Sequence, residues 1–308
     1  MACDSRQTND DVHAGYYVVC LIDLLGQKDK LQGWCEWPEN GQLTESMWAS
    51  MRESAGVVLG LRRDLIEHFQ LYAMRRLPDE ALAMMSDMQR QQWQRHNDIK
   101  LSVQQFSDTF VLYSPTADSQ GDVLVMPMYA MLATCCLTML ASLAAGVPLR
   151  GSIHVGTGLR HQEIGFYGPA LAKAHHLEDE VAQYPRILVS SEVVDFVTGP
   201  APRAGDEKVS EWLQGLLATC RDFICRDQDG HTMVDFLGKG MHTIQEGSRP
   251  GMITAVTKAY RFACTEAARF KKADSHELAG RYALLRRYIE SRLPIWGLGH
   301  LTEADDGA

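Results

Sequence analysis

The sequence predicts an α+β protein, an α/β plait in which helices pack on an antiparallel sheet, followed by C-terminal helices. Three observations predict this fold class. An apolar, β-branched run near the N-terminus is typical of a buried strand, two helical segments follow it, and a strand pair with a polar turn comes next. Helices and strands alternate after that pair, which is the order of a plait whose helices cover one face of its sheet.

The first strand is expected at residues 16–24 (YYVVCLIDL), which are apolar and β-branched apart from one acid. Such a run is typical of a strand buried on both faces. Asp23 then lies at the end of this strand. After a loop rich in Trp, Pro and Gly, residues 43–73 and 79–94 have the apolar spacing of helices with one solvated face.

A hairpin is expected at residues 101–113 (LSVQQFSDTFVLY), because polar residues separate two short apolar runs. The turn falls at Phe106-Ser107-Asp108, which puts Asp108 at the tip. A plait brings the first strand beside this hairpin. We therefore expect Asp23 and Asp108 to lie close together.

Residues 123–149 carry no charged side chain and are long enough to be a membrane-span candidate. However, the run contains Pro127 and Ser142, lacks flanking basic anchors, and ends in Gly146-Val147-Pro148 before a strand-like segment. We expect a buried helix lying on the sheet, with no membrane insertion.

The remaining elements complete the plait. Strands are expected at residues 149–156 (LRGSIHVG), 163–167 and 185–189 (PRILV), with a helix at 169–181.

The last third of the chain adds a strand segment and a helical pair. Residues 226–238 (RDQDGHTMVDFLG) have a sheet-like pattern with a turn at Asp229-Gly230. Residues 254–292 are amphipathic and interrupted near 273–275, which predicts a terminal helical hairpin.

Composition limits the kind of partner and the compartment. With 308 residues, of which 45% are hydrophobic, the chain can bury a sizeable core, and its net charge of −9 argues against a nucleic-acid-binding protein. The eight cysteines have no Cys-x-x-Cys spacing and mostly lie in apolar runs, which indicates reduced core residues. Residues 1–11 are polar without an apolar signal-peptide core, so we expect a cytoplasmic protein.

Two carboxylates on neighbouring strand ends can bridge two divalent cations, and their oxygen atoms favour Mg²⁺ or Mn²⁺ over zinc. Such ions would let an acidic protein hold a triphosphate. Backbone N–H groups in the turn at Leu25-Gly26 can bind phosphate oxygens, and Lys28 adds positive charge. Taken singly, Asp23 and Asp108 are equally well explained as turn residues, and only their pairing favours a metal site.

Four short motifs in one order resemble the class III nucleotide cyclases, and most closely the pyrimidine cyclases of the Pycsar antiphage system. They are IDLLG at 22–26, QFSD at 105–108, LRGSIHVG at 149–156 and YGPALA at 167–172. The resemblance covers about residues 16–190, within a cyclase domain at 1–245. The helical extension at 246–308 is only loosely similar.

The resemblance implies an adenylyl cyclase catalytic fold with a ferredoxin-like core, acting as a homodimer with sites at the subunit interface. It implies that Asp23 and Asp108, with the carbonyl of Leu24, ligate two Mg²⁺ or Mn²⁺ ions. It also implies conversion of a nucleoside triphosphate, UTP or CTP, to a 3′,5′-cyclic nucleotide and pyrophosphate. The product would signal to a separate cyclic-nucleotide-binding effector in phage defence.

The sequence departs from purine cyclases at four positions of that family pattern. Gln104 stands where a purine-reading Lys is usual, and Gly165 where an adenine-reading Asp is usual. The Gln104 amide can both donate and accept a hydrogen bond, so the sequence does not decide between uracil and cytosine as the base. The transition-state Asn and Arg fall on Ala172 and His176.

Either another cation such as Arg150 or Lys173 replaces that Arg, or turnover is slow. A structural ion pair is an equal alternative for Arg150. His176 could donate to a phosphate when protonated, but a solvated or packed side chain is the more ordinary interpretation. None of His154, His161 or His175 has zinc-ligand spacing.

Three other functions remain open. One is an adenylyl or guanylyl cyclase. A second is a polymerase-like palm, which shares the plait and both acids, although the chain lacks basic surface for a template. The third is a catalytically inactive cyclase fold that binds nucleotides, suggested by Ala172 and His176.

Overall fold

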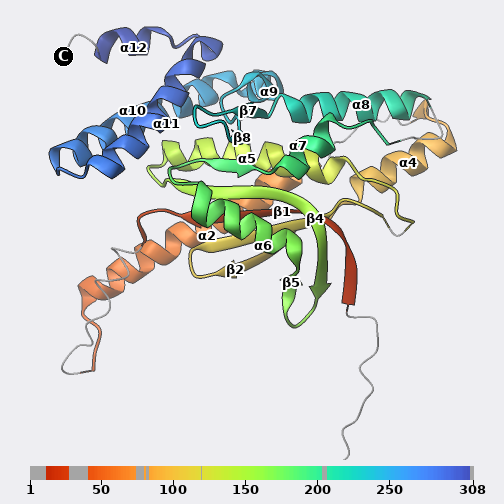
Figure 1. Cartoon of the computed structure of the whole chain (residues 1–308), viewed down its shortest axis with the longest axis horizontal. Helices are drawn as coiled ribbons and strands as arrows, with labels where there is room; N and C mark the ends of the chain where they lie inside the picture. The colour runs from red at the N-terminus through yellow and green to blue at the C-terminus, as the bar shows by residue number, and fades with distance from the viewer. Residues whose placement is uncertain are drawn as a thin grey trace, which may run out of the picture.

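The computed structural model describes residues 12–27, 41–73, 80, 83–118, 120–202 and 207–305 (Figure 1). These residues form one eight-stranded sheet with helices on both of its faces. The strands are β1 (Val12–Leu24), β2 (Ser102–Phe106), β3 (Thr109–Pro115), β4 (Leu149–His161), β5 (Gly165–Tyr167), β6 (Ile187–Val189), β7 (Ile224–Arg226) and β8 (Thr232–Val234).

The sheet runs in the order β2-β3-β1-β4-β6-β8-β7, and β5 pairs with β4 beside this path. β1 therefore lies between the hairpin β2–β3 and β4, as the plait predicts. The prediction of an entirely antiparallel sheet is wrong at one place, because β4 and β6 pair in parallel. A crossover through a helix between these strands brings the chain back in the same direction.

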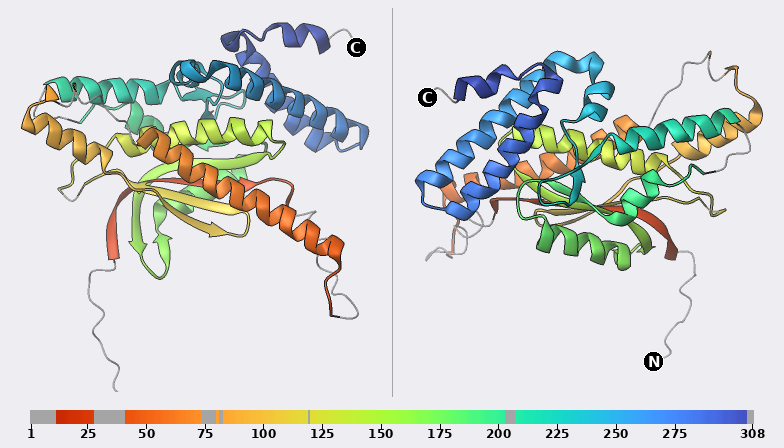
Figure 2. Two further views of the ribbon diagram at one scale, coloured as in Figure 1. Left: turned by 180° about the vertical axis from the view of Figure 1, so that it is seen from behind. Right: turned by 45° about the horizontal axis from the view of Figure 1, so that its top comes forward.

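Alternate residues of β1 supply a hydrophobic core on each side of the sheet. Val18, Cys20 and Ile22 belong to the large core that includes α5 (Met126–Ala144) and α2 (Glu45–Ala73). The odd-numbered residues of the same strand, from Tyr17 to Leu21, pack with α6 (Pro169–His176) on the other side. The prediction that helices cover only one face is therefore wrong, and Figure 2 shows α6 across the sheet from α5.

Helix α5 occupies the uncharged stretch and lies against the sheet as expected. Among the described residues it is the one helix long and apolar enough to cross a membrane, and 89% of its apolar window is buried inside the protein. Residues on nearly every side of α5 are buried in the large core.

Several element boundaries differ from the prediction. Helix α4 (Asp87–Asn97) extends beyond the predicted end at 94, and Ser86 and Gln89 form a capping box at its start. Residues 79, 81 and 82 of the predicted helix lie outside the described residues. The helix expected at 169–181 divides into α6 and a π-helical turn, Leu177–Val181. Helices α7 (Ser191–Thr198) and α8 (Glu207–Arg221) were not predicted, nor were the two short helices near the C-terminus that are described next.

The C-terminal hairpin consists of α10 (Arg249–Lys272) and α11 (His276–Arg292), and the break at 273–275 is confirmed. Short helices α9 (Lys239–Ile244) and α12 (His300–Asp305) flank it. The hairpin shares the large core with α5. Asp235, after β8, accepts hydrogen bonds from Tyr288 and Arg292 of α11. A domain boundary near 245 stays a prediction.

Candidate active site

A row of four side chains crosses one end of the sheet. Register pairs join Phe106 on β2 to Thr109 on β3, Thr109 to Asp23 on β1, and Asp23 to Arg150 on β4. Paired residues share a face, and Asp23 lies on the same face of β1 as Val19 and Leu21, which pack on α6. The end row, Phe106-Thr109-Asp23-Arg150, therefore lies on the α6 side of the sheet.

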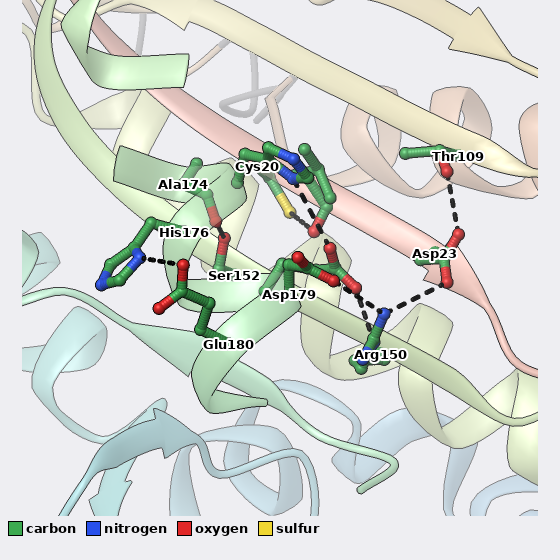
Figure 3. Close-up of polar contacts among 12 residues, drawn as sticks. Cys20, Asp23, Thr109, Arg150, Ser152, Ala174, His176, Asp179 and Glu180 are labelled. Carbon is green, nitrogen blue, oxygen red and sulfur yellow. Dashed lines mark hydrogen bonds and ion pairs between the residues drawn. The ribbon is translucent and has the colours of Figure 1, made fainter. Parts of the chain in front are cut away.

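The Asp23 carboxylate is held from both sides within this row (Figure 3). The Thr109 hydroxyl donates a hydrogen bond to Asp23 Oδ1 at 2.8 Å, and Arg150 Nη2 lies 3.7 Å from Oδ2. Burial raises the pKa of Asp23, the Thr109 hydrogen bond opposes that rise, and the neighbouring charge of Asp108 adds to it. Thr109 was missed by sequence reasoning, although it directly follows Asp108.

Asp108 reaches Asp23 through the geometry of the hairpin. Ser107 adopts a left-handed φ of 58°, which closes the tight turn between β2 and β3. The backbone N–H of Leu24 lies 3.4 Å from the Asp108 carbonyl oxygen to which it donates. The structure thus brings both predicted acids and the Leu24 backbone to one end of the sheet.

Arg150 is surrounded by carboxylates. Its Nε lies 2.5 Å from Oε1 of Glu178, an ion pair without hydrogen-bond geometry, and its Nη2 lies 4.0 Å from Oδ1 of Asp179. Glu178 is buried, which raises its pKa, while Arg150 opposes the rise. Arg150 therefore forms structural ion pairs, which is one of the two roles that the sequence left open for it. Nothing in the sequence indicated these acids, because only the π-helical turn places them here.

The turn after Asp23 offers limited phosphate binding among the described residues. Gly26 has a φ of 82° and is exposed, and its N–H has no acceptor in the described part of the chain. The Leu25 N–H already donates to the Pro148 carbonyl oxygen at 3.0 Å. Lys28, the predicted cation of this turn, lies outside the described residues.

Gln104 and Gly165, the two base-reading positions of the family pattern, contact each other. The Phe166 N–H donates to Gln104 Oε1 at 2.8 Å, and Gln104 Nε2 donates to the Ile164 carbonyl oxygen at 3.4 Å. A side chain at Gly165 would collide with the Gln104 amide. Gln104 lies on the same face as Asp23, one row behind it. Its amide groups hold the β4–β5 hairpin in this conformation.

The predicted cations on α6 have acidic partners. Lys173 Nζ binds Glu192 Oε1 at 2.7 Å, which holds the pKa of Glu192 at about 2. His176 Nδ1 lies 3.2 Å from Glu180 Oε1, and Ala172 is exposed. No contact joins Lys173 or His176 to the end row in the described structure. His154 is buried against Ser190 at 3.0 Å, and burial lowers its pKa.

Oxygen atoms are the ligands that this site can offer to a metal ion. The described residues contain no group of three or more His, Cys, Asp or Glu side chains arranged to hold an ion. Asp23 and Asp108 supply two carboxylates at this end of the sheet, and the Leu24 carbonyl stays a predicted ligand. These are hard oxygen donors, and a divalent cation would relieve the repulsion by Asp108 that adds to the effect of burial on the Asp23 pKa. The donor set suits Mg²⁺ or Mn²⁺, with further ligands coming from a bound triphosphate and water.

Comparisons with known proteins give little further guidance. The sequence matches no protein-family model, and no curated protein matches it significantly. Among solved structures, it is similar to the catalytic core of a rhodopsin-guanylyl cyclase with converted specificity in complex with ATPαS. That similarity has a TM-score of 0.35 at 8% identity and covers 62% of this chain and 86% of that one. Because it is low, the function is inferred from the chain's own residues.

Proposed function

We propose that the chain is a metal-dependent nucleotide cyclase that converts UTP or CTP to the 3′,5′-cyclic nucleotide and pyrophosphate. The observation that supports it most is the convergence of Asp23, Asp108 and the Leu24 backbone at one end of the sheet. The order of the four cyclase-like motifs supports it as well. Phage defence, a homodimer and a separate effector follow from the resemblance alone and stay proposals.

The reaction needs one bond to form and one to break. The ribose 3′-oxygen bonds to the α-phosphorus, the α–β phosphoanhydride bond breaks, pyrophosphate leaves, and the hydroxyl proton passes to solvent. Two Mg²⁺ or Mn²⁺ ions would supply positive charge for the 3′-oxygen and the triphosphate. Asp23 and Asp108 would hold that charge in place, and Thr109 would orient the Asp23 carboxylate.

The proposed contacts with the base and the phosphates follow from the positions and present partners of the predicted side chains. Gln104 faces the α6 side and can present either a donor or an acceptor to a pyrimidine once it releases the β4–β5 hairpin. Arg150 and Lys173 can bind phosphate only if each releases the carboxylate with which it is paired. Gly26 offers an N–H that has no acceptor among the described residues.

A second candidate, a cyclase fold that binds nucleotides without turnover, is favoured by one observation. Every cation predicted for the transition state that the structure describes is engaged by a carboxylate: Arg150, Lys173 and His176. The two candidates differ in whether pyrophosphate is released.

Incubation of the purified protein with each nucleoside triphosphate and Mn²⁺, followed by mass spectrometry and a pyrophosphate assay, tests the proposal. We expect a cyclic pyrimidine nucleotide, and loss of product in both Asp23→Ala and Asp108→Ala. Asp195→Ala is the matched control, because Asp195 is exposed on α7 and away from the end row. Triphosphate binding without any pyrophosphate would support the inactive module, and a cyclic purine product would contradict the pyrimidine assignment.

A further inference from the structure

A cavity of about 650 Å³ lies between the C-terminal hairpin and the turn that follows β1. Leu25, Gly26 and Gln27 form one wall, the α5–β4 loop forms another, and α10 and α11 close it. Its volume falls within the roughly 300–1,000 Å³ of small-molecule sites. The hairpin therefore encloses a space large enough for a ligand.

This cavity is on the opposite side of the sheet from the Asp23 carboxylate. Tyr184 and Tyr282, which line it, belong to the large core on the α5 side. Asp23 alternates along β1 with Ile22 of that core and faces α6. A ligand in the cavity would therefore not occupy the space in front of the end row.

Aromatic rings form part of the apolar lining of the cavity. Phe262, Phe270 and Tyr282 line it, and the rings of Phe270 and Tyr282 are stacked with centroids 5.5 Å apart. Gly146, with a φ of 75°, leaves space beside the Phe262 ring. Surfaces of this kind favour a flat ring, which can stack on or meet them edge to face.

Two polar groups in the cavity have hydrogen-bonding capacity to spare. Gln27 is 5% exposed, and its Oε1 accepts from the Ser54 hydroxyl at 3.1 Å, but its Nε2 has no acceptor among the described residues. The Tyr282 hydroxyl likewise has no hydrogen-bond partner in the described part of the chain. Burial raises the pKa of Tyr282 to about 12, so the hydroxyl stays a neutral donor. Neither donor atom is fully buried, so both can donate to a ligand in the cavity that brings acceptors.

Two arginines and one glutamate line the same cavity. Arg269 is paired with Glu266 three residues earlier, and Arg281 donates to Glu277 at 2.6 Å, four residues earlier. The Arg281–Glu277 pair is solvent-accessible and contributes little to stability, so an anionic ligand can exchange for Glu277. Guanidinium groups bind phosphate and carboxylate in a bidentate manner.

We propose that this cavity is a second ligand site, which takes a planar heterocycle carrying an anionic group, of the class of a nucleoside monophosphate. The ring lies among the aromatic side chains, its acceptor atoms meet Gln27 and Tyr282, and the anion meets Arg281. Because Gln27 and Gly26 follow Asp23 within four residues, the ligand contacts the turn adjoining the candidate active site. The site does not depend on the proposed cyclase activity.

Calorimetric titration of UMP and AMP into full-length Asp23→Asn/Asp108→Asn protein, with EDTA present, tests this site without the metal-dependent one. We expect at least one of the two nucleotides to bind, and to bind more tightly than uridine or inorganic phosphate alone. Arg281→Gln weakens binding by about tenfold through loss of the anion contact. Tyr282→Phe, which keeps the ring, weakens it by about fivefold.

Arg287→Gln is the matched control, because Arg287 is on the same helix but outside the cavity, 3.5 Å from Gln228. Arg287→Gln should bind the nucleotide as tightly as the parent protein does. Circular dichroism confirms that each variant is folded. Failure of both UMP and AMP to bind overturns the proposal, and so does binding that Arg281→Gln and Tyr282→Phe leave unchanged. Neither result bears on turnover at Asp23 and Asp108.

Discussion

The two sides of the sheet are built differently. On the α5 side, helices α2, α5, α10 and α11 cover a continuous hydrophobic core. On the α6 side, one helix of eight residues covers a small cluster, and the end of the sheet is left to Asp23, Arg150 and the exposed ring of Phe106. The same strand β1 supplies both sides. The α5 side of the sheet therefore stabilises the fold, whereas the α6 side leaves the charged side chains of the end row uncovered by a large core.

The largest expected effect concerns the charge at the end row. Asp23→Asn keeps the shape of the side chain but removes its negative charge, so formation of cyclic product should fall by about a thousandfold. The free energy of unfolding, measured by urea titration without metal, should not decrease, because the repulsion with Asp108 is lost. A variant that loses activity only because it unfolds would contradict the division between the two sides.

The α5 side should show the opposite behaviour. Leu132 is fully buried on α5, and Leu132→Ala should lower the free energy of unfolding by about 3 kcal/mol, since it leaves a cavity in the core. Urea titration measures this loss. Leu59→Ala on α2 is the matched control, because Leu59 is 63% exposed, and it should change stability by less than about 0.5 kcal/mol. Equal losses for both would show that α5 is not the core helix described.

A third change probes contact with a second copy of the chain. Phe106 is 62% exposed at the tip of β2, at the edge of the end row. If the proposed homodimer covers this row, Phe106→Ser should raise its dissociation constant by about tenfold, with the unfolding of the monomer unchanged. Sedimentation at several concentrations measures the constant. Identical dimerisation of the variant and the parent would remove this surface from the interface.

The smallest effect is a pH dependence on the α6 side. Lys173 holds the pKa of Glu192 at about 2, below its ordinary value of 4.5. The ionised Glu192 therefore adds stability above pH 4.5, and this contribution is lost as the pH falls from 4.5 towards 2. Because both side chains are substantially exposed, the contribution is small. Glu192→Gln should make the acid unfolding profile slightly shallower in that window, and an unchanged profile would disprove the assignment.

Much of the sheet could be predicted because its residues carry local patterns. The apolar run ending at Asp23 and the polar turn around Ser107 are sufficient to place β1 and the hairpin. Helix α7 was missed although Ser190 caps it, since its eight residues are too few to show a clear period. The parallel pairing of β4 and β6 depends on a crossover that no short segment specifies.

Some contacts of the candidate site could likewise be predicted from the sequence, and others could not. Asp23 and Asp108 could be paired from the order of the elements alone. The partners of Arg150 and Lys173 could not, because Glu178 and Glu192 reach them from other elements through a π-helical turn and a separate helix. Long-range ion pairs depend on the finished fold, and the sequence holds no periodic trace of them.

Direct detection of bound Mn²⁺ by electron paramagnetic resonance, with a non-hydrolysable pyrimidine triphosphate present, tests most directly whether Asp23 and Asp108 share one metal site. The shared site predicts that the parent protein binds Mn²⁺, and that Asp23→Asn and Asp108→Asn each lose it, while Asp195→Asn keeps it. Full Mn²⁺ binding by either Asp23→Asn or Asp108→Asn would contradict the shared site.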